Sequence, residues 1–273
     1  APDFIWKIIL GIDPNLIKEK GERGRTIFHD LAKAYASKEI IDCITEHFKD
    51  DTKTIEDLFS TKEDETKMLP IHYAAACRVK KDLLETYIKF SKSGGMDSCL
   101  LSTDAEGLMP IHWALHYDER ICKINMVVDA ESIDVLLRAY SEIDGYENDQ
   151  ILKKTAPFFD KDQKEYIKLT PLLFAVRSNL TPLSVVKKLM PEAPTEEDEQ
   201  SNKDDWTLHT AVMFITSIDI ITVIAENDVY KNNIVKPYPE FDKMTPLHIA
   251  AKFNKNPKIV EYLIKIEENY INE

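Results

Sequence analysis

The chain has 273 residues, of which 44% are hydrophobic and 30% are charged, and this is an ordinary globular composition. Its formal net charge of -13 at pH 7 argues against nucleic acid and against an anionic membrane surface as partners, because both need a basic face. No stretch approaches the roughly 20 apolar residues of a membrane span, so we expect no direct membrane insertion. The high charge favours a monomer.

The first 23 residues predict one helix and a loop. The run FIWKIILG has an amphipathic pattern, and DPNLIKEKGERG is typical of a connection. Trp6 and its apolar neighbours would cover the open end of a stack of helices. We therefore assign residues 1–23 to an N-terminal capping helix or half-repeat.

One short phrase then recurs six times with variations. Its best copies carry helix-start signals, because Thr caps a helix through its hydroxyl group and Pro is tolerated at the first helical position. Amphipathic segments such as KEIIDCITEHF and PKIVEYLIKI follow, with apolar residues three and four positions apart. The copies are TIFHDLA at 26–32, LPIHYAA at 69–75, MPIHWAL at 109–115, TPLLFAV at 170–176, WTLHTAV at 206–212 and TPLHIAA at 245–251.

The last copy matches the ankyrin phrase T-P-L-H-x-A-A at every fixed position. The sequence therefore resembles the ankyrin-repeat family over nearly its whole length. The resemblance implies an all-α solenoid of about six helix-turn-helix repeats with long, irregular hairpin or finger loops. It places a repeat domain at 24–273, with repeat cores near 24–50, 67–91, 107–140, 168–191, 204–228 and 243–270.

The copies depart from the family pattern in spacing and in composition. They lie farther apart than the family period of about 33 residues, and polar connectors fill the difference. We expect these connectors to form the fingers, and the largest, at 141–167, to include an overlong outer helix or an additional short helix. The glycine that usually separates the two helices is missing in most copies. Leu173 stands where the other copies have His, so the fourth repeat must satisfy its turn differently.

The cysteines and histidines do not predict a chemical site. Four cysteines without close spacing, at positions 43, 77, 99 and 122, are too few for a disulfide framework. We expect reduced thiols in an intracellular, cytoplasmic protein, with the nucleus as the alternative location. The phrase histidines would stand a repeat apart, whereas metal ligands converge within about 2.3 Å of one ion. The resemblance implies instead that they bond backbone groups and tie each helix to the adjoining turn.

Other signatures of catalysis are missing from the sequence as well. It contains no P-loop phrase and no GxGxxG, and the acidic run at 191–205 lacks the spacing of a calcium-binding EF-hand loop. We therefore expect no catalytic residue, no cofactor and no metal, and a chain that is not an enzyme.

The resemblance places partner binding on the inner helices and fingers. The facing positions precede the phrase or follow its second Ala, and many are apolar or aromatic, as interface cores are. The alternative is that the long connectors fold back and bury these side chains. The predicted partner-binding residues are Met68, Leu108, His116, Tyr117, Leu169, Arg177, Asp205, Met213, Phe214, Met244, Lys252 and Phe253.

Three functions fit this sequence. The first is a non-catalytic scaffold or adaptor that binds an extended or helical peptide of a partner protein, with acidic fingers steering a basic flank of that partner. The second is the cytosolic regulatory domain of a larger membrane channel or multidomain protein. The third is a fragment of an ankyrin-associated enzyme. The partner itself is not encoded in the fold.

Overall fold

The computed structural model describes residues 9–92, 99–122, 127–143, 148–160, 165–191, 206–239 and 241–272. The backbone divides into two compact units, which we call unit 1 (Ala1–Lys168) and unit 2 (Leu169–Glu273). Residues 9–12 are helical, while most of the predicted N-terminal helix, with Trp6, lies outside the described residues.

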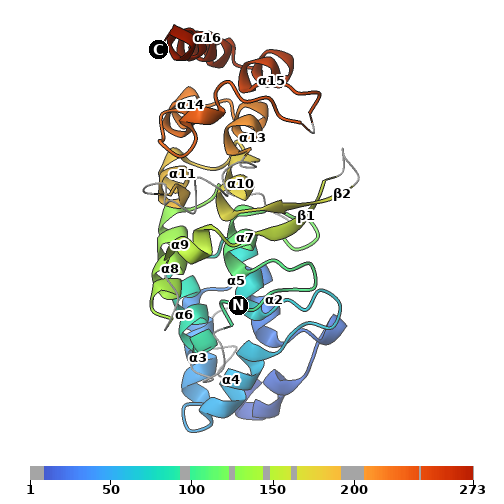
Figure 1. Ribbon diagram of the computed structural model, residues 1–273. Coiled ribbons are helices and arrows are strands. Elements are labelled where there is room, and N and C mark those ends of the chain that lie inside the picture. Colours follow the sequence, from blue (N-terminus) through green and yellow to red (C-terminus); the bar gives the residue numbers. More distant parts are fainter. Residues whose placement is uncertain are drawn as a thin grey trace. The chain divides into compact units, whose positions relative to one another are not determined.

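Unit 1 contains three pairs of helices. The inner helices are α2 (Ile27–Lys33), α5 (Pro70–Ala76) and α7 (Pro110–Leu115), and they pack one on the next. The outer helices are α3 (Lys38–His47), α6 (Lys81–Lys92) and α8 (Ala130–Ser141), and they form a second row beside the first (Figure 1). Each inner helix is the recurring phrase, and each outer helix is the amphipathic segment that follows it.

Unit 2 repeats this arrangement with three more pairs. Its inner helices are α10 (Pro171–Val176), α13 (Thr207–Phe214) and α15 (Pro246–Phe253). Its outer helices are α11 (Leu183–Leu189), α14 (Ile218–Ala225) and α16 (Pro257–Asn272). Neighbouring pairs pack against each other within the unit (Figure 1). The prediction of an all-α repeat solenoid is therefore confirmed.

The connectors hold more regular structure than polar loops would. Part of the first connector forms α4 (Thr52–Ser60), whose Ile55, Leu58 and Phe59 are buried. The longest connector contains the short helix α9 (Asn148–Leu152) and the paired strands β1 (Ala156–Asp160) and β2 (Glu165–Leu169). The described residues also form three short 3-10 helices, η1 (Pro14–Lys18), η2 (Glu22–Gly24) and η4 (Lys231–Asn233).

The phrase histidines join each repeat to the next. The backbone N–H groups of Thr26, Leu69 and Met109 each donate to the Nδ1 of the histidine three residues later, at 3.0–3.1 Å. Since Nδ1 accepts, the neutral ring carries its proton on Nε2. That Nε2–H then donates to a carbonyl further along the chain, at 3.1 Å in each case: His29 to Met68, His72 to Ser102 and His112 to Lys154.

The other three repeats modify this bridge. Nε2 of His209 reaches the Lys236 carbonyl at 2.7 Å, but its buried Nδ1 has no hydrogen-bond partner among the described residues. His248 is exposed, and its Nδ1 contacts Thr245 Oγ1 at 2.7 Å. In the repeat that carries Leu173, Thr170 Oγ1 accepts the Leu173 amide at 3.3 Å. A side-chain cap thus replaces the histidine there.

Cys77 and Cys122 form a disulfide bond, so the expectation of reduced thiols is wrong for this pair. The two residues lie 45 positions apart in sequence, and stacking of α5 against α7 brings them together. Both residues are buried, whereas Cys43 and Cys99 are partly exposed and lie outside this bond. Disulfides persist in oxidising compartments. The location of the protein stays a prediction.

Acid should weaken the fold through the buried histidines. Burial lowers the pKa of His29, His112 and His209 to about 4 and that of His72 to about 3. Because the folded pKa values lie below the unfolded value near 6.5, the stability they confer is full above that pH and falls as the pH drops towards 4. Between about pH 7 and pH 5, the free energy of unfolding should fall by roughly 2 kcal/mol for each of these histidines, because the unfolded chain takes up a proton there.

Thermal melts at several pH values would test this acid sensitivity. His112→Gln should melt lower than the wild type near pH 7 and lose less stability on acidification, because one proton-linked site is gone. The exposed His248 is the matched control, and His248→Gln should keep the wild-type pH dependence. Equal pH dependence of His112→Gln and the wild type would contradict the role given to His112.

The disulfide should stabilise unit 1. Closing a loop of this length restricts the unfolded chain, and Cys122→Ala should lower the free energy of unfolding by roughly 2–4 kcal/mol. Melts with and without a reductant should differ for the wild type and coincide for the variant. Cys43→Ala is the control and should keep the difference. Labelling of four thiols in the denatured, unreduced protein would show that the bond does not form.

Candidate binding surface

Three of the predicted partner-binding residues offer no surface to a partner. Met68, Leu108 and Leu169 are only 0%, 2% and 4% exposed, so their assignment to an open groove is wrong. For the first two the cause is a hairpin that folds the connector back over the inner helix. In these hairpins the amide of Glu63 donates to the Met68 carbonyl at 2.9 Å, and that of Asp104 donates to the Leu108 carbonyl at 3.1 Å.

A buried carboxylate accepts hydrogen bonds within each of these two hairpins. Asp104 accepts the amides of Glu106 and Leu108 and the Trp113 Nε1–H, at 2.8–2.9 Å. Glu63 accepts the Tyr73 hydroxyl at 2.9 Å. In both hairpins the donor ring comes from the residue directly after the phrase histidine. The aromatic residue after the histidine in HYA and HWA is the sequence signal for this contact.

In unit 1 the remaining predicted residues, His116 and Tyr117, are partly exposed. The ring of His116 lies edge-on to Phe158 of β1, with centroids 5.6 Å apart, and close to Trp113. The strand pair therefore contacts the end of α7. This arrangement agrees with the alternative in which a long connector covers part of the inner-helix face.

In unit 2 the predicted residues that the structure describes remain accessible, with the exception of Leu169. Lys252 is exposed, and Asp205 lies outside the described residues. The five residues that are partly exposed are Arg177, Met213, Phe214, Met244 and Phe253. Arg177, Met213 and Lys252 occupy the same position in three successive phrases, so they lie at the same end of the stacked helices α10, α13 and α15.

A series of aromatic rings extends this exposed region onto the connector between α14 and α15. Trp206 stacks on Tyr238 with ring centroids 4.5 Å apart, and Tyr238 stacks on Phe241 at 6.2 Å. Phe241 then meets Phe253 of α15 edge-on at 5.5 Å. All four rings are partly exposed. With Phe214 they form what we call the aromatic surface.

Positively charged groups lie over this aromatic surface. Nζ of Lys236 is 4.4 Å from the centroid of the Trp206 ring, and Nζ of Lys252 is 5.0 Å from that of Phe253. The Arg177 guanidinium lies 4.8 Å from the Phe214 ring. Cations over ring faces gain electrostatic energy. Sequence analysis missed Trp206, Lys236, Tyr238 and Phe241, although Trp206 replaces the usual Thr of the phrase.

The same helices carry no carboxylate. Residues 171–178, 207–214 and 246–255 include no Asp or Glu, although the whole chain has 48 acidic residues against 35 Lys and Arg. The described acidic residues of unit 2 lie on outer helices or connectors, as Asp219, Asp242 and Glu261 do. These three segments therefore carry basic side chains, among them Arg177 and Lys252, and no acidic ones, on a protein that is acidic as a whole.

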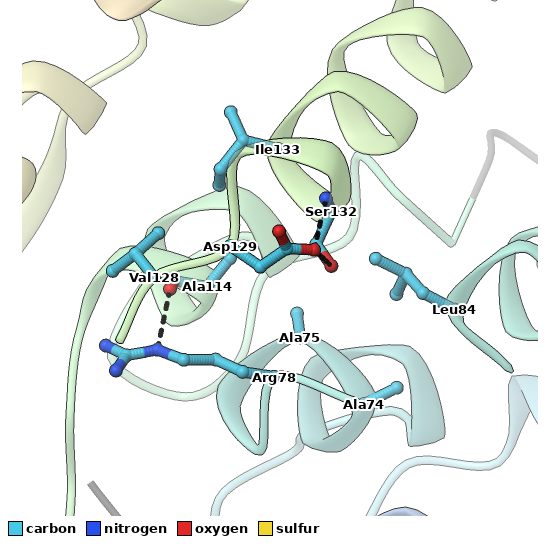
Figure 2. Close-up of a pocket in the computed structure, with 9 residues that line it drawn as sticks. All are labelled: Ala74, Ala75, Arg78, Leu84, Ala114, Val128, Asp129, Ser132 and Ile133. Atoms are coloured by element: carbon cyan, nitrogen blue, oxygen red, sulfur yellow. Dashed lines mark hydrogen bonds between the residues drawn. The ribbon is translucent and has the colours of Figure 1, made fainter. Parts of the chain in front are cut away.

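A small cavity between α5 and α8 in unit 1 is no ligand site. Its volume is about 10 Å³, whereas pockets for small molecules measure about 300–1,000 Å³. Figure 2 shows Arg78 beside it, donating to the Ala114 carbonyl at 3.2 Å, and Asp129 capping α8 at the Ser132 amide.

Arg78 and Tyr35 also adopt left-handed backbone angles (φ 50° and 52°) after α5 and α2, where a glycine is usual.

Within the described parts of the chain, no three His, Cys, Asp or Glu side chains gather as a metal-binding group would. Nor does any described helix have the length and apolar character needed to cross a membrane.

Comparison with known proteins agrees with this architecture. A family model described as ankyrin repeats, in three copies, matches residues 172–272, which cover the three helix pairs of unit 2. The crystal structure of the human ASB11 ankyrin repeat domain is similar over 95% of this chain and 90% of that one, with a TM-score of 0.55 and 14% sequence identity.

The ankyrin repeat domain of Bcl-3, a member of the IkappaB protein family, covers 96% of this chain and 91% of its own at 14% identity, with a TM-score of 0.43. No curated protein matches the sequence. The match of residues 172–272 and the similarity of fold over nearly the whole length lead to one conclusion. Residues 172–272 consist of ankyrin repeats, and the chain as a whole has the ankyrin-repeat fold.

Proposed function

We propose that the chain is a non-catalytic scaffold or adaptor that binds a partner protein through unit 2. Ankyrin repeats are generally protein–protein interaction modules and are typically non-catalytic. One observation supports the assignment to unit 2: the aromatic surface leaves five rings partly exposed beside cations. Aromatic residues, Met and Arg are enriched in the cores of protein interfaces.

The surface has the anatomy of an interface rather than of a hydrophobic core. Its rings are partly exposed, whereas Ile249, Ala250 and Leu208 on the same helices are buried. A large exposed apolar patch with a polar rim marks an interaction site in many soluble proteins. A regulatory domain of a larger membrane or multidomain protein, the second function above, would use the same surface.

The proposal predicts loss of a partner when two rings are removed. The double variant Phe214→Ala, Phe253→Ala should lose a protein that the wild type retains in affinity capture from a native extract. Buried interface aromatics each contribute about 2 kcal/mol or more, so the loss should exceed tenfold. Circular dichroism melts should show that the variant is still folded.

A matched control distinguishes binding at this surface from nonspecific binding through exposed apolar side chains. Ile264 is 41% exposed and lies on the outer helix α16, outside the aromatic surface. The variant Ile264→Ala should therefore retain the captured protein. Capture of the same protein by the folded double variant would place binding elsewhere and refute the proposal.

A further inference from the structure

One position of the recurring phrase is covered in unit 1 and open in unit 2. Cys77 is the second residue after the phrase LPIHYAA, as Phe214 and Phe253 are after their own phrases. Both phenylalanines are partly exposed, whereas Cys77 is 1% exposed and Ala76 beside it is 6% exposed. The position that contributes two rings to the aromatic surface of unit 2 is therefore closed at the end of α5.

The residues that close it form a short turn after α7, at 118–122, which we call the cover turn. The amides of Ile121 and Cys122 each donate to the Asp118 carbonyl at 3.0 Å, and Asp118 Oδ1 accepts the Arg120 amide at 2.8 Å. Because these hydrogen bonds lie within the turn, it can move away from the inner helices without breaking them.

The disulfide bond joins the cover turn to the preceding repeat. Cys77 is the C-cap residue of α5, and Cys122 is the last residue of the turn. One repeat further back, Nζ of Lys33 in the last turn of α2 donates to the Arg120 carbonyl at 3.4 Å. The turn thus starts in the third repeat and reaches back past the end of α5 to the end of α2.

The other contacts hold the cover turn weakly. The hydrogen bond from Lys33 is long and exposed, and Ile121, at 7% exposure, supplies one buried aliphatic side chain. Ordering the backbone of all the residues of the turn costs more free energy than one isoleucine and one exposed hydrogen bond return. We therefore expect the turn to leave α5 once the disulfide is broken.

We propose that the bond between Cys77 and Cys122 is a redox-controlled latch: a dithiol reductant releases the cover turn and exposes the end of α5 while unit 1 stays folded. A thiolate of the dithiol attacks one sulfur of the bond, and its second thiol then displaces the mixed disulfide. The reductant leaves as a cyclic disulfide, and its two protons end on the thiols of Cys77 and Cys122. This regulation of unit 1 goes beyond the proposed function of unit 2 and does not depend on it.

A pulse of thiol labelling on the full chain tests the latch. The protein is reduced with excess dithiol, separated from it without oxygen and exposed briefly to iodoacetamide in native buffer, and mass spectrometry measures the label on Cys77. The released thiol should react within about tenfold of its rate in denaturant, whereas a thiol that stays covered would react at least about a hundredfold more slowly. In the same pulse, hydrogen exchange should leave the amides of the buried Tyr87 and Ile88 in α6 protected.

Two variants show that the bond itself controls exposure. Cys122→Ala should have a reactive Cys77 without any reductant. The matched control, Cys43→Ala with Cys99→Ala, removes two cysteines outside the bond, and its Cys77 should still need the reductant before it reacts.

Three results would overturn the latch. The dithiol could leave the bond intact in native buffer, or Cys77 could stay protected in the reduced wild type. Alternatively, the α6 amides could lose protection as fast as Cys77 is labelled, in which case the bond only stabilises unit 1 against unfolding. The reduced wild type decides among these results even if Cys122→Ala fails to fold. None of them bears on whether the Phe214→Ala, Phe253→Ala variant loses its captured protein.

Discussion

The two-sided hydrogen bonding of the phrase histidines is the interaction on which the array depends. In three repeats one ring nitrogen accepts a hydrogen bond from the amide of the N-cap residue of its own inner helix, while the other donates to the backbone of a later segment. A single side chain thus fixes the start of a helix and the position of the next connector. The bond works only with a neutral ring, and burial ensures that state near pH 7.

These bonds also position the connectors, and the connectors determine which side chains are exposed for binding. Where a histidine anchors a hairpin, as His29 does at Met68, the residue before the next phrase turns inward and its side chain is buried. In unit 2, His209 anchors Lys236 instead, and Tyr238 two residues later stacks on Trp206. The same bond that buries a methionine in one repeat therefore holds an aromatic ring at the surface in another.

The sequence predicted the repeats well because they are local. The phrase and the amphipathic segment after it lie within a few turns of helix, so periodicity and helix-start residues identify them. The disulfide, helix α4 and the stacking of Trp206 on Tyr238 were not predicted. Cys77 and Cys122, like the two rings, are brought together by the packing of repeats, and no spacing rule covers connectors of irregular length.

Within the candidate site, the accuracy of the sequence-based prediction followed position in the phrase. Residues after the second Ala of the phrase, such as Met213 and Lys252, lie at the ends of helices and remain accessible, because a helix fixes the direction of its side chains. Residues before the phrase belong to hairpins, and Met68 and Leu108 are buried whereas Met244 is partly exposed, because their orientation depends on hairpin register, which the sequence pattern does not reveal.

The bond between Cys77 and Cys122 also gives unit 1 an uneven response to mechanical force. Pulled from its two ends, the chain would extend freely outside the bridged segment, while the 45 positions between the cysteines would stay closed. At about 3.4 Å per extended residue, the bond withholds roughly 15 nm of contour length. The outer helix of the second repeat, α6, and the inner helix of the third, α7, would thus be shielded from tension, and reduction of the bond would lengthen the chain that force can extend.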